Sequence, residues 1–216
     1  MRRFDAGCRT ARELVRSGAL GRLHTVRTMT ADPAPPPAAY LATSGGLYRD
    51  CLVHDFDMVR WVTGHEVSEV YATGSDAGGP VFRELGDVDT AIALLTLDDG
   101  TLATCTGTRC NGAGYDVRME LAGTLDQVSS GLDDRTPIAS TEPHGPPPAS
   151  KPWTGFLERF APAYEAELAA FVKLVRGEGP NPCDGREALA ALRIAEACEV
   201  SRRERRPVRM AELPDL

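Results

Sequence analysis

The sequence has no long apolar run and no excess of basic charge, and each absence excludes a class of protein. No stretch approaches the roughly 20 apolar residues of a membrane-spanning helix, and no apolar segment follows Met1 as a signal peptide would require. The 24 Lys and Arg residues are outnumbered by 31 Asp and Glu, which gives a net charge of −7. Because nucleic-acid-binding surfaces are basic, we expect neither nucleic acid nor membrane as a partner. A small polar molecule fits this balance better.

Paired cysteine motifs are also missing. The 6 cysteines are scattered and show no C-x-x-C spacing, at positions 8, 51, 105, 110, 183 and 198. This distribution argues against a zinc knuckle or a disulfide scaffold and favours a reducing compartment. We therefore predict a cytoplasmic protein without a metal site. The 216 residues are 42% hydrophobic, which is enough for a domain with a real core.

Helical and strand-like periods follow one another along the chain. Helices are predicted over 8–18, 45–63 and 162–176, with a last one opening at Asp184. Strands are predicted over 23–30, 66–73, 87–97, 101–109, 115–121 and 125–130. A proline-rich segment over 132–155 forms a long irregular crossing. The pattern predicts a single α+β domain over 1–216, with a largely antiparallel open sheet of about six strands and flanking helices.

One face of the strand predicted over 101–109 is unusually rich in threonine. Leu102, Thr104, Thr106 and Thr108 alternate along it. Such a face either meets a second subunit, which would make the protein a homo-oligomer, or is simply solvated.

The helix predicted over 45–63 carries the most informative residues. At 100° per residue, Asp50, His54 and Asp57 fall within roughly 60° of one another on an otherwise apolar helix. An Asp one turn before a His can hydrogen-bond it or share a proton path with it. A His side chain with an ordinary pKa near 6.5 is suited to accept an alcohol proton at neutral pH. The same stripe is also typical of a solvated helix face, and it rarely encloses a metal ion.

In their order along the chain, several segments resemble the glucose–fructose oxidoreductase/inositol dehydrogenase (Gfo/Idh/MocA) family, and its inositol 2-dehydrogenases in particular. The matching segments are Met1-Arg2-Arg3-Phe4-Asp5, Ser17-Gly18-Ala19-Leu20-Gly21 with the strand after it, Gly45-Gly46 through Asp57, Gly114-Tyr115-Asp116, and the helix around Arg159 to Glu165. No single motif decides the assignment, but the ordered set is specific.

The resemblance implies an oxidoreductase that removes hydride from a CH–OH carbon of a polyol or sugar, such as myo-inositol, and passes it to NAD or NADP. In that scheme His54 accepts the hydroxyl proton, and Asp50 orients His54 or relays its proton. Arg2 and Tyr115 match positions that line the substrate pocket. Asp32 falls where relatives commonly have Asn, and Cys51 where they often have Thr, which leaves the preferred polyol open.

The family's nucleotide-binding half has no counterpart in this sequence. A Rossmann domain brings a Gly-rich phosphate loop, and the family also has a catalytic lysine in a Glu-Lys-Pro motif. Neither motif occurs, and the lysines, Lys151 and Lys173, lie late in the chain. We therefore expect no cofactor-binding residues here. We interpret 1–5 as the remnant of a junction strand, left by a truncation, by a mis-assigned start or by a separately encoded partner domain.

Two functions remain open on the sequence. One is the substrate-binding and oligomerisation half of a nicotinamide-dependent dehydrogenase. The alternative is a catalytically silent module that oligomerises or binds a sugar-like ligand.

Overall fold

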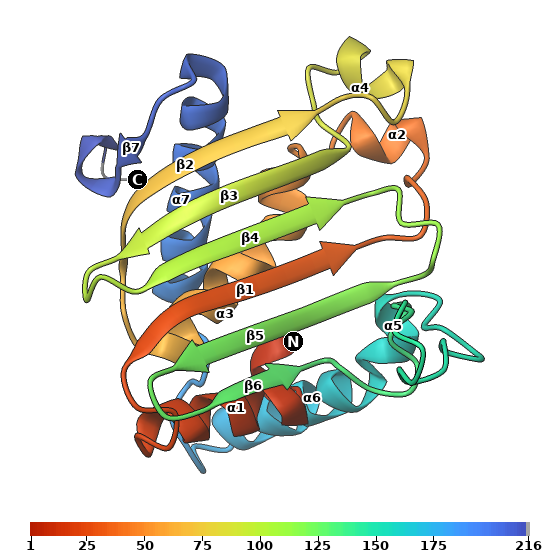
Figure 1. Ribbon diagram of the computed structural model, residues 1–216. Coiled ribbons are helices and arrows are strands. Elements are labelled where there is room, and N and C mark those ends of the chain that lie inside the picture. The colour runs from red at the N-terminus through yellow and green to blue at the C-terminus, as the bar shows by residue number, and fades with distance from the viewer. Residues whose placement is uncertain (215–216) are drawn as a thin grey trace.

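The protein, described here by a computed structural model over residues 1–214, is built on a seven-stranded sheet with helices on one face (Figure 1). The strand order is β6-β5-β1-β4-β3-β2-β7. The strands are β1 (Leu23–Ala31), β2 (Val67–Ser75), β3 (Thr90–Leu97), β4 (Leu102–Thr108), β5 (Asp116–Gly123), β6 (Gln127–Ser130) and β7 (Val208–Arg209). The predicted α+β class and largely antiparallel sheet are confirmed. The seventh strand, β7, was not predicted because two residues are too few to show a periodicity.

The pairing of β4 with β3 on one side and with β1 on the other explains the topology. β3 and β4 form the predicted hairpin, and its turn uses Gly100 at a φ of 85°. β1 pairs antiparallel with β5 on one side and parallel with β4 on the other. Parallel neighbours need a long crossover, and here the chain leaves β1 through helices, reaches β2, and returns by way of β3.

The helices that shape the domain are grouped behind the sheet, as Figure 1 shows for α1, α3, α6 and α7. The helical elements are η1 (Arg2–Phe4), α1 (Ala6–Arg16), α2 (Ala38–Leu41), η2 (Tyr48–Leu52), α3 (Val53–Thr63), α4 (Pro80–Glu84), α5 (Phe156–Arg159), α6 (Ala161–Val175), α7 (Gly185–Glu204) and η3 (Met210–Glu212). No helix within the described part of the chain has both the length and the apolar character needed to cross a membrane. The end of a strand expected at 1–5 is instead the 3₁₀ turn η1.

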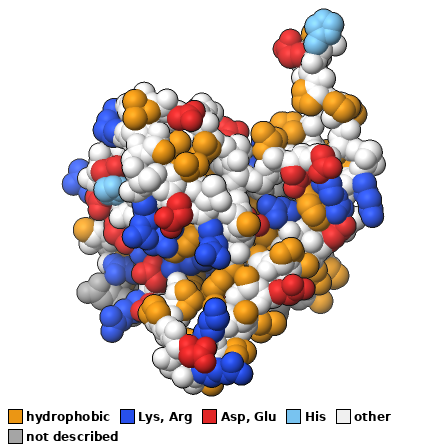
Figure 2. Space-filling model, turned by 90° about the horizontal axis from the view of Figure 1, so that it is seen from below, with side chains coloured by type: hydrophobic (Ala, Val, Ile, Leu, Met, Phe, Trp, Pro, Cys, Tyr) orange, Lys and Arg blue, Asp and Glu red, His pale blue; other side chains and the backbone are white. Residues whose placement is uncertain are grey.

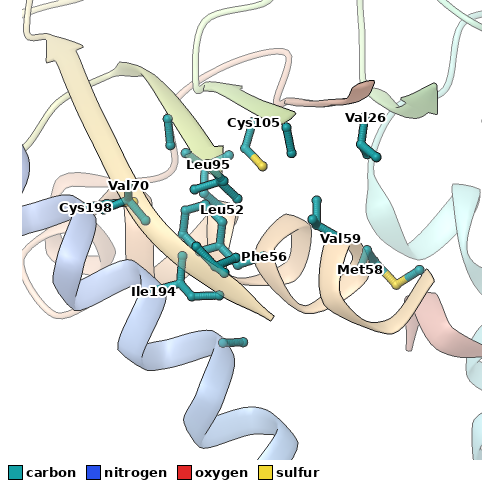
Figure 3. Packing of buried hydrophobic residues seen from close by; sticks show 14 of the residues in the cluster. Val26, Leu52, Phe56, Met58, Val59, Val70, Leu95, Cys105, Ile194 and Cys198 are labelled. Carbon is teal, nitrogen blue, oxygen red and sulfur yellow. The ribbon is translucent and has the colours of Figure 1, made fainter. Parts of the chain in front are cut away.

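The core lies between the sheet and the helices η2, α3 and α7. Figure 3 shows Leu52, Phe56 and Val59 directed towards strand residues such as Leu95 and Cys105. On β4 the residues of this face are small, Ala103, Cys105 and Gly107, and at Gly107 an added Cβ would lie 3.0 Å from the Leu52 side chain. Glycine at this position therefore lets η2 approach β4 closely, which brings η2 to the carboxyl end of the central strands.

The helix predicted over 45–63 contains an irregular first part. η2 is a π-helical turn, and regular α-helix begins only at Val53. A π-turn changes the angle between successive side chains, so positions on either side of it no longer follow the 100° rule. The 100° rule that predicted the stripe therefore does not relate Asp50 to His54 and Asp57.

No helix within residues 1–214 covers the opposite face of the sheet. Tyr71, Ile92, Leu94 and Leu102 are exposed there, and Thr104, Thr106 and Thr108 are partly exposed. The uncovered threonine-rich face expected from the sequence is thus present, and it is more apolar than the predicted strand 101–109 alone indicated.

Candidate active site

One cavity of about 730 Å³ lies at the carboxyl end of β1 and β4, between η1, η2 and the proline-rich loop after β1. Its wall includes every residue proposed for the site from the sequence: Arg2, Asp32, Asp50, Cys51, His54 and Tyr115. These residues come from η1, the end of β1, η2, α3 and the start of β5, so only the fold brings them together.

Arg2 forms the floor of the cavity together with two buried partners. Its Nη1 lies 3.2 Å from Asp55 Oδ1, and its Nη2 donates a hydrogen bond of 3.1 Å to Thr30 Oγ1. The Thr30 hydroxyl in turn donates to Asp55 Oδ2 at 2.7 Å. Burial raises the pKa of Asp55, and the charge of Arg2 opposes that shift. The triangle of bonds holds the guanidinium in place at the base of the pocket.

Asp50 is held by two side chains that were not identified from the sequence. Arg109 Nη2 donates to Asp50 Oδ2 at 2.7 Å, and the Tyr40 hydroxyl donates to Asp50 Oδ1 at 2.7 Å. The hydrogen bond to Asp50 raises the pKa of Tyr40 to about 12, so its proton stays on the phenol. Asp50 therefore presents a carboxylate whose oxygens are both occupied.

His54 projects into the cavity without a hydrogen-bond partner among residues 1–214. Burial of part of the ring lowers its pKa to about 4, and the positive charge of Arg2 acts in the same direction. The residue as a whole is nevertheless exposed, and it lines the pocket. At neutral pH the imidazole is neutral and is therefore in the form that can accept a proton. The bond from Asp50 to His54 expected from helical spacing is not formed, because the π-turn directs Asp50 towards Arg109.

Asp32 and Cys51 make the wall beside Asp50. The Cys51 thiol donates weakly to Asp32 Oδ2 at 3.8 Å. Burial raises the pKa of Asp32, while the charge of Arg109 opposes the shift and that of Asp50 reinforces it. The Asp32 backbone is tied to Thr108 and Asn111 by hydrogen bonds of 2.9 and 2.8 Å. These bonds fix the backbone that carries the carboxylate at the carboxyl end of β1.

Tyr115 closes the far side of the cavity. Its amide donates to the Trp153 carbonyl at 3.0 Å, and its ring packs with Phe160 and Ala163 in a second, smaller core. Burial raises the pKa of its phenol, which therefore stays protonated and can donate or accept a hydrogen bond. Asp57, the third member of the predicted stripe, points elsewhere and pairs with Arg3.

Sequence reasoning missed Arg109, Tyr40 and Asp55. A signal existed for Arg109, since the alternation of β4 places it on the covered face with Ala103 and Cys105. A buried arginine needs a partner, so this position was informative. Tyr40 lies on the short helix α2 beyond the proline-rich loop, and no local pattern connects it to Asp50.

The candidate metal-ligand cluster of the described residues and the Gly112–Gly114 turn both lie outside this cavity. Among residues 1–214, one group has ligand atoms close enough for an ion, the partly exposed His65 with the exposed Asp98 and Asp99, and none of its members lines the cavity. Gly112 and Gly114 lie in a turn between β4 and β5, and dinucleotide loops instead join a strand to a helix. This glycine pair therefore does not have the setting of a dinucleotide-binding loop.

Comparisons with known proteins agree with this geometry. The family description "GFO/IDH/MocA C-terminal domain" matches residues 8–129. Fold and family description together define a C-terminal domain of this kind. The chain belongs to the GFO/IDH/MocA family.

Among curated relatives, an uncharacterized oxidoreductase YrbE of Bacillus subtilis is 38% identical over 93% of this chain and 58% of its own length. The myo-inositol 2-dehydrogenase of Thermotoga maritima is 35% identical over 98% of this chain and 63% of its own length. The chain therefore spans about three fifths of the length of these relatives.

Solved structures share the fold. A probable dehydrogenase from Thermotoga maritima superposes with a TM-score of 0.89 at 35% identity, over 98% of this chain and 64% of the other. A scyllo-inositol dehydrogenase from Lactobacillus casei, solved with bound NAD(H) and scyllo-inositol, gives a TM-score of 0.82 at 30% identity, over 97% and 62% of the two chains.

Proposed function

We propose that this chain is the substrate-binding part of a nicotinamide-dependent dehydrogenase that oxidises a CH–OH group of a cyclic polyol, of the myo-inositol 2-dehydrogenase class. The observation that carries the proposal is the convergence of Arg2, Asp50, His54 and Tyr115, from separate elements, on one cavity. The relatives whose names specify inositol, and the neighbour solved with NAD(H) and scyllo-inositol, support the same class.

In this proposal His54 takes the proton of the reacting hydroxyl. A neutral imidazole with no competing hydrogen bond among the described residues has its lone pair free for a substrate hydroxyl. The pair of Asp50 with Arg109 fixes one wall of the pocket, and Tyr115 and Arg2 offer donors to further hydroxyls. The hydride acceptor is NAD or NADP bound by residues other than those described here.

Binding of myo-inositol to the purified chain tests the substrate part directly. Titration calorimetry, with ligand-observed NMR for weak binding, should show binding that weakens when Tyr115 is changed to Ala. The matched control is Tyr71→Ala, because Tyr71 is exposed on the uncovered sheet face, outside the cavity. Absence of polyol binding, or equal loss in both variants, would reject the proposal.

The proton role of His54 is tested by the same titration followed by NMR of its ring. A hydroxyl that hydrogen-bonds the free imidazole nitrogen should shift the His54 ring signals on saturation with myo-inositol. The signals of His24, an exposed strand residue outside the cavity, should stay in place. Unchanged His54 signals in a saturated sample would remove His54 from the mechanism.

We also propose that the uncovered sheet face joins copies of the chain into a homo-oligomer. Exposed apolar side chains on adjacent strands, Tyr71, Ile92, Leu94 and Leu102, support this assembly. Light scattering should give a mass above that of one chain, and Ile92→Arg should return it to the monomer. A monomer at all concentrations would reject this proposed assembly.

The free thiols of all 6 cysteines support our assignment of the protein to the cytoplasm.

A further inference from the structure

The acidic and basic groups of the cavity are almost completely matched in pairs. Arg2 pairs with Asp55 and Arg109 with Asp50, at 3.2 and 2.7 Å. The Met1 amino group, also at the cavity wall, lies 3.4 Å from Glu167. Both arginines are therefore already neutralised by carboxylates of their own.

Asp32 is the carboxylate left over from this pairing. Its side chain forms no ion pair with any cation of residues 1–214, and its hydrogen-bond partner is the weak thiol donor of Cys51 at 3.8 Å. The loop after β1 adds apolar lining to the same cavity through Pro33, Ala34, Pro36 and Pro37, while Cys51 and Asp50 lie on the other side of Asp32. Asp32 is therefore the one carboxylate of this cavity, among residues 1–214, whose negative charge no cation balances at contact distance, because the nearby Arg109 is already paired with Asp50.

A neutral polyol does not balance this charge when it displaces water from the cavity. Hydroxyl groups of the ligand can donate hydrogen bonds to Asp32, but the carboxylate loses solvation without gaining an opposite charge. An alkylammonium group compensates for the lost solvation through its three N–H donors, and its positive charge balances the carboxylate. The other walls of the cavity still offer hydroxyl partners through Tyr115 and Arg2.

We infer that the cavity takes an amino-polyol, a polyhydroxylated ring in which one hydroxyl is replaced by a protonated amine, and that Asp32 binds the ammonium group. The inference rests on the proposed function, which supplies the ring and its hydroxyls. It adds that the substrate carries a positive charge.

The test compares two ligands that differ by a single group. Myo-inositol and an inositol with one hydroxyl replaced by an amine are titrated into the purified chain at pH 7, together with the N-acetylated amine as a neutral analogue. We expect the amine to bind roughly tenfold more tightly than myo-inositol, as for a hydrogen bond between charged groups. The N-acetylated form should lose that advantage.

Variants assign the preference to Asp32. Asp32→Asn should abolish the preference for the amine, so that the variant binds the amine no more tightly than myo-inositol. Asp126→Asn removes the same charge from an exposed turn outside the cavity and should leave the preference intact. A preference that survives in Asp32→Asn, or a parent chain that binds myo-inositol at least as well as the amine, overturns the inference but not the proposed function. Failure of the parent chain to bind either ring overturns both.

Discussion

Helices α3 and α6 both have apolar sequences, but α3 is largely buried and α6 is largely exposed. α3 buries seven of its 11 residues, including the charged Asp55 and Arg60. α6 is longer, at 15 residues, and buries only Ala163. Its apolar stripe of Leu168, Phe171, Val172 and Val175 is exposed by between 46% and 71%. Figure 2, which views the molecule from the side on which α6 lies, shows apolar side chains interspersed with charged ones on this surface.

The surroundings of the two helices account for the difference. α3 packs against α1, α7 and the strands β1 and β4, so nearly every direction around it is occupied. α6 packs mainly against η1 and α5 at its N-terminal end. An apolar stripe therefore predicts that a helix has a face to bury, and it does not say whether the same chain supplies the cover. The following predictions test this contrast, from the largest expected effect to the smallest.

Truncation of one phenylalanine in each helix should give the largest contrast. Phe56 of α3 is fully buried, and Phe56→Ala should lower the free energy of unfolding by about 3–5 kcal/mol. Phe171 of α6 is 60% exposed, and Phe171→Ala should change it by no more than about 0.5 kcal/mol. Urea denaturation followed by circular dichroism measures both. Similar losses in the two variants would show that α6 is covered in solution.

Removal of one carboxyl charge from each helix should give a smaller contrast. Asp55→Asn leaves the buried Arg2 guanidinium without its counter-charge but keeps hydrogen-bonding atoms, so we expect a loss of about 2–3 kcal/mol. Glu167 of α6 is 40% exposed and pairs with the Met1 amino group, so Glu167→Gln should cost no more than about 1 kcal/mol. The same denaturation experiment applies. A near-zero effect of Asp55→Asn would mean that Arg2 finds another partner.

The fold was largely predictable from the sequence because strands and turns have local signatures. The alternation in 115–121 and the turn Asp98-Asp99-Gly100 correspond to β5 and the β3–β4 hairpin. The site was predictable only in its membership. Which residues share the cavity followed from the resemblance, but their bonds depend on elements that no local pattern connects. The π-turn at η2 and the salt bridge from Arg109 at the end of β4 direct Asp50 away from His54.

Lowering the pH should destabilise the domain through His54 on α3. Its pKa is about 4 in the folded state against an ordinary value of 6.5, so the unfolded chain binds more protons between these values. The free energy of unfolding therefore falls as the pH drops from about 6.5 towards 4. Because one side of the ring is exposed and solvent screens it, we expect a contribution of only about 1 kcal/mol.

NMR titration of the His54 ring should give a midpoint near pH 4, and His54→Gln should flatten the stability profile in this window. His24→Gln, at an exposed strand position, is the matched control and should leave the profile unchanged. A His54 midpoint above pH 6 would show that water surrounds the ring.

Polar replacement of the α6 stripe should have the smallest effect on stability. With Leu168, Phe171, Val172 and Val175 changed to Gln or Thr, the domain should unfold within about 1 kcal/mol of the parent, because these side chains gain little burial on folding. Binding of the dye ANS should fall, since the exposed apolar area falls. The corresponding change in α3, Val59→Thr, should instead destabilise, because Val59 is fully buried. If the α6 variant unfolds as readily as Val59→Thr, the stripe is buried in solution by contacts that α6 forms with its own domain or with a second copy, and the contrast between the helices disappears.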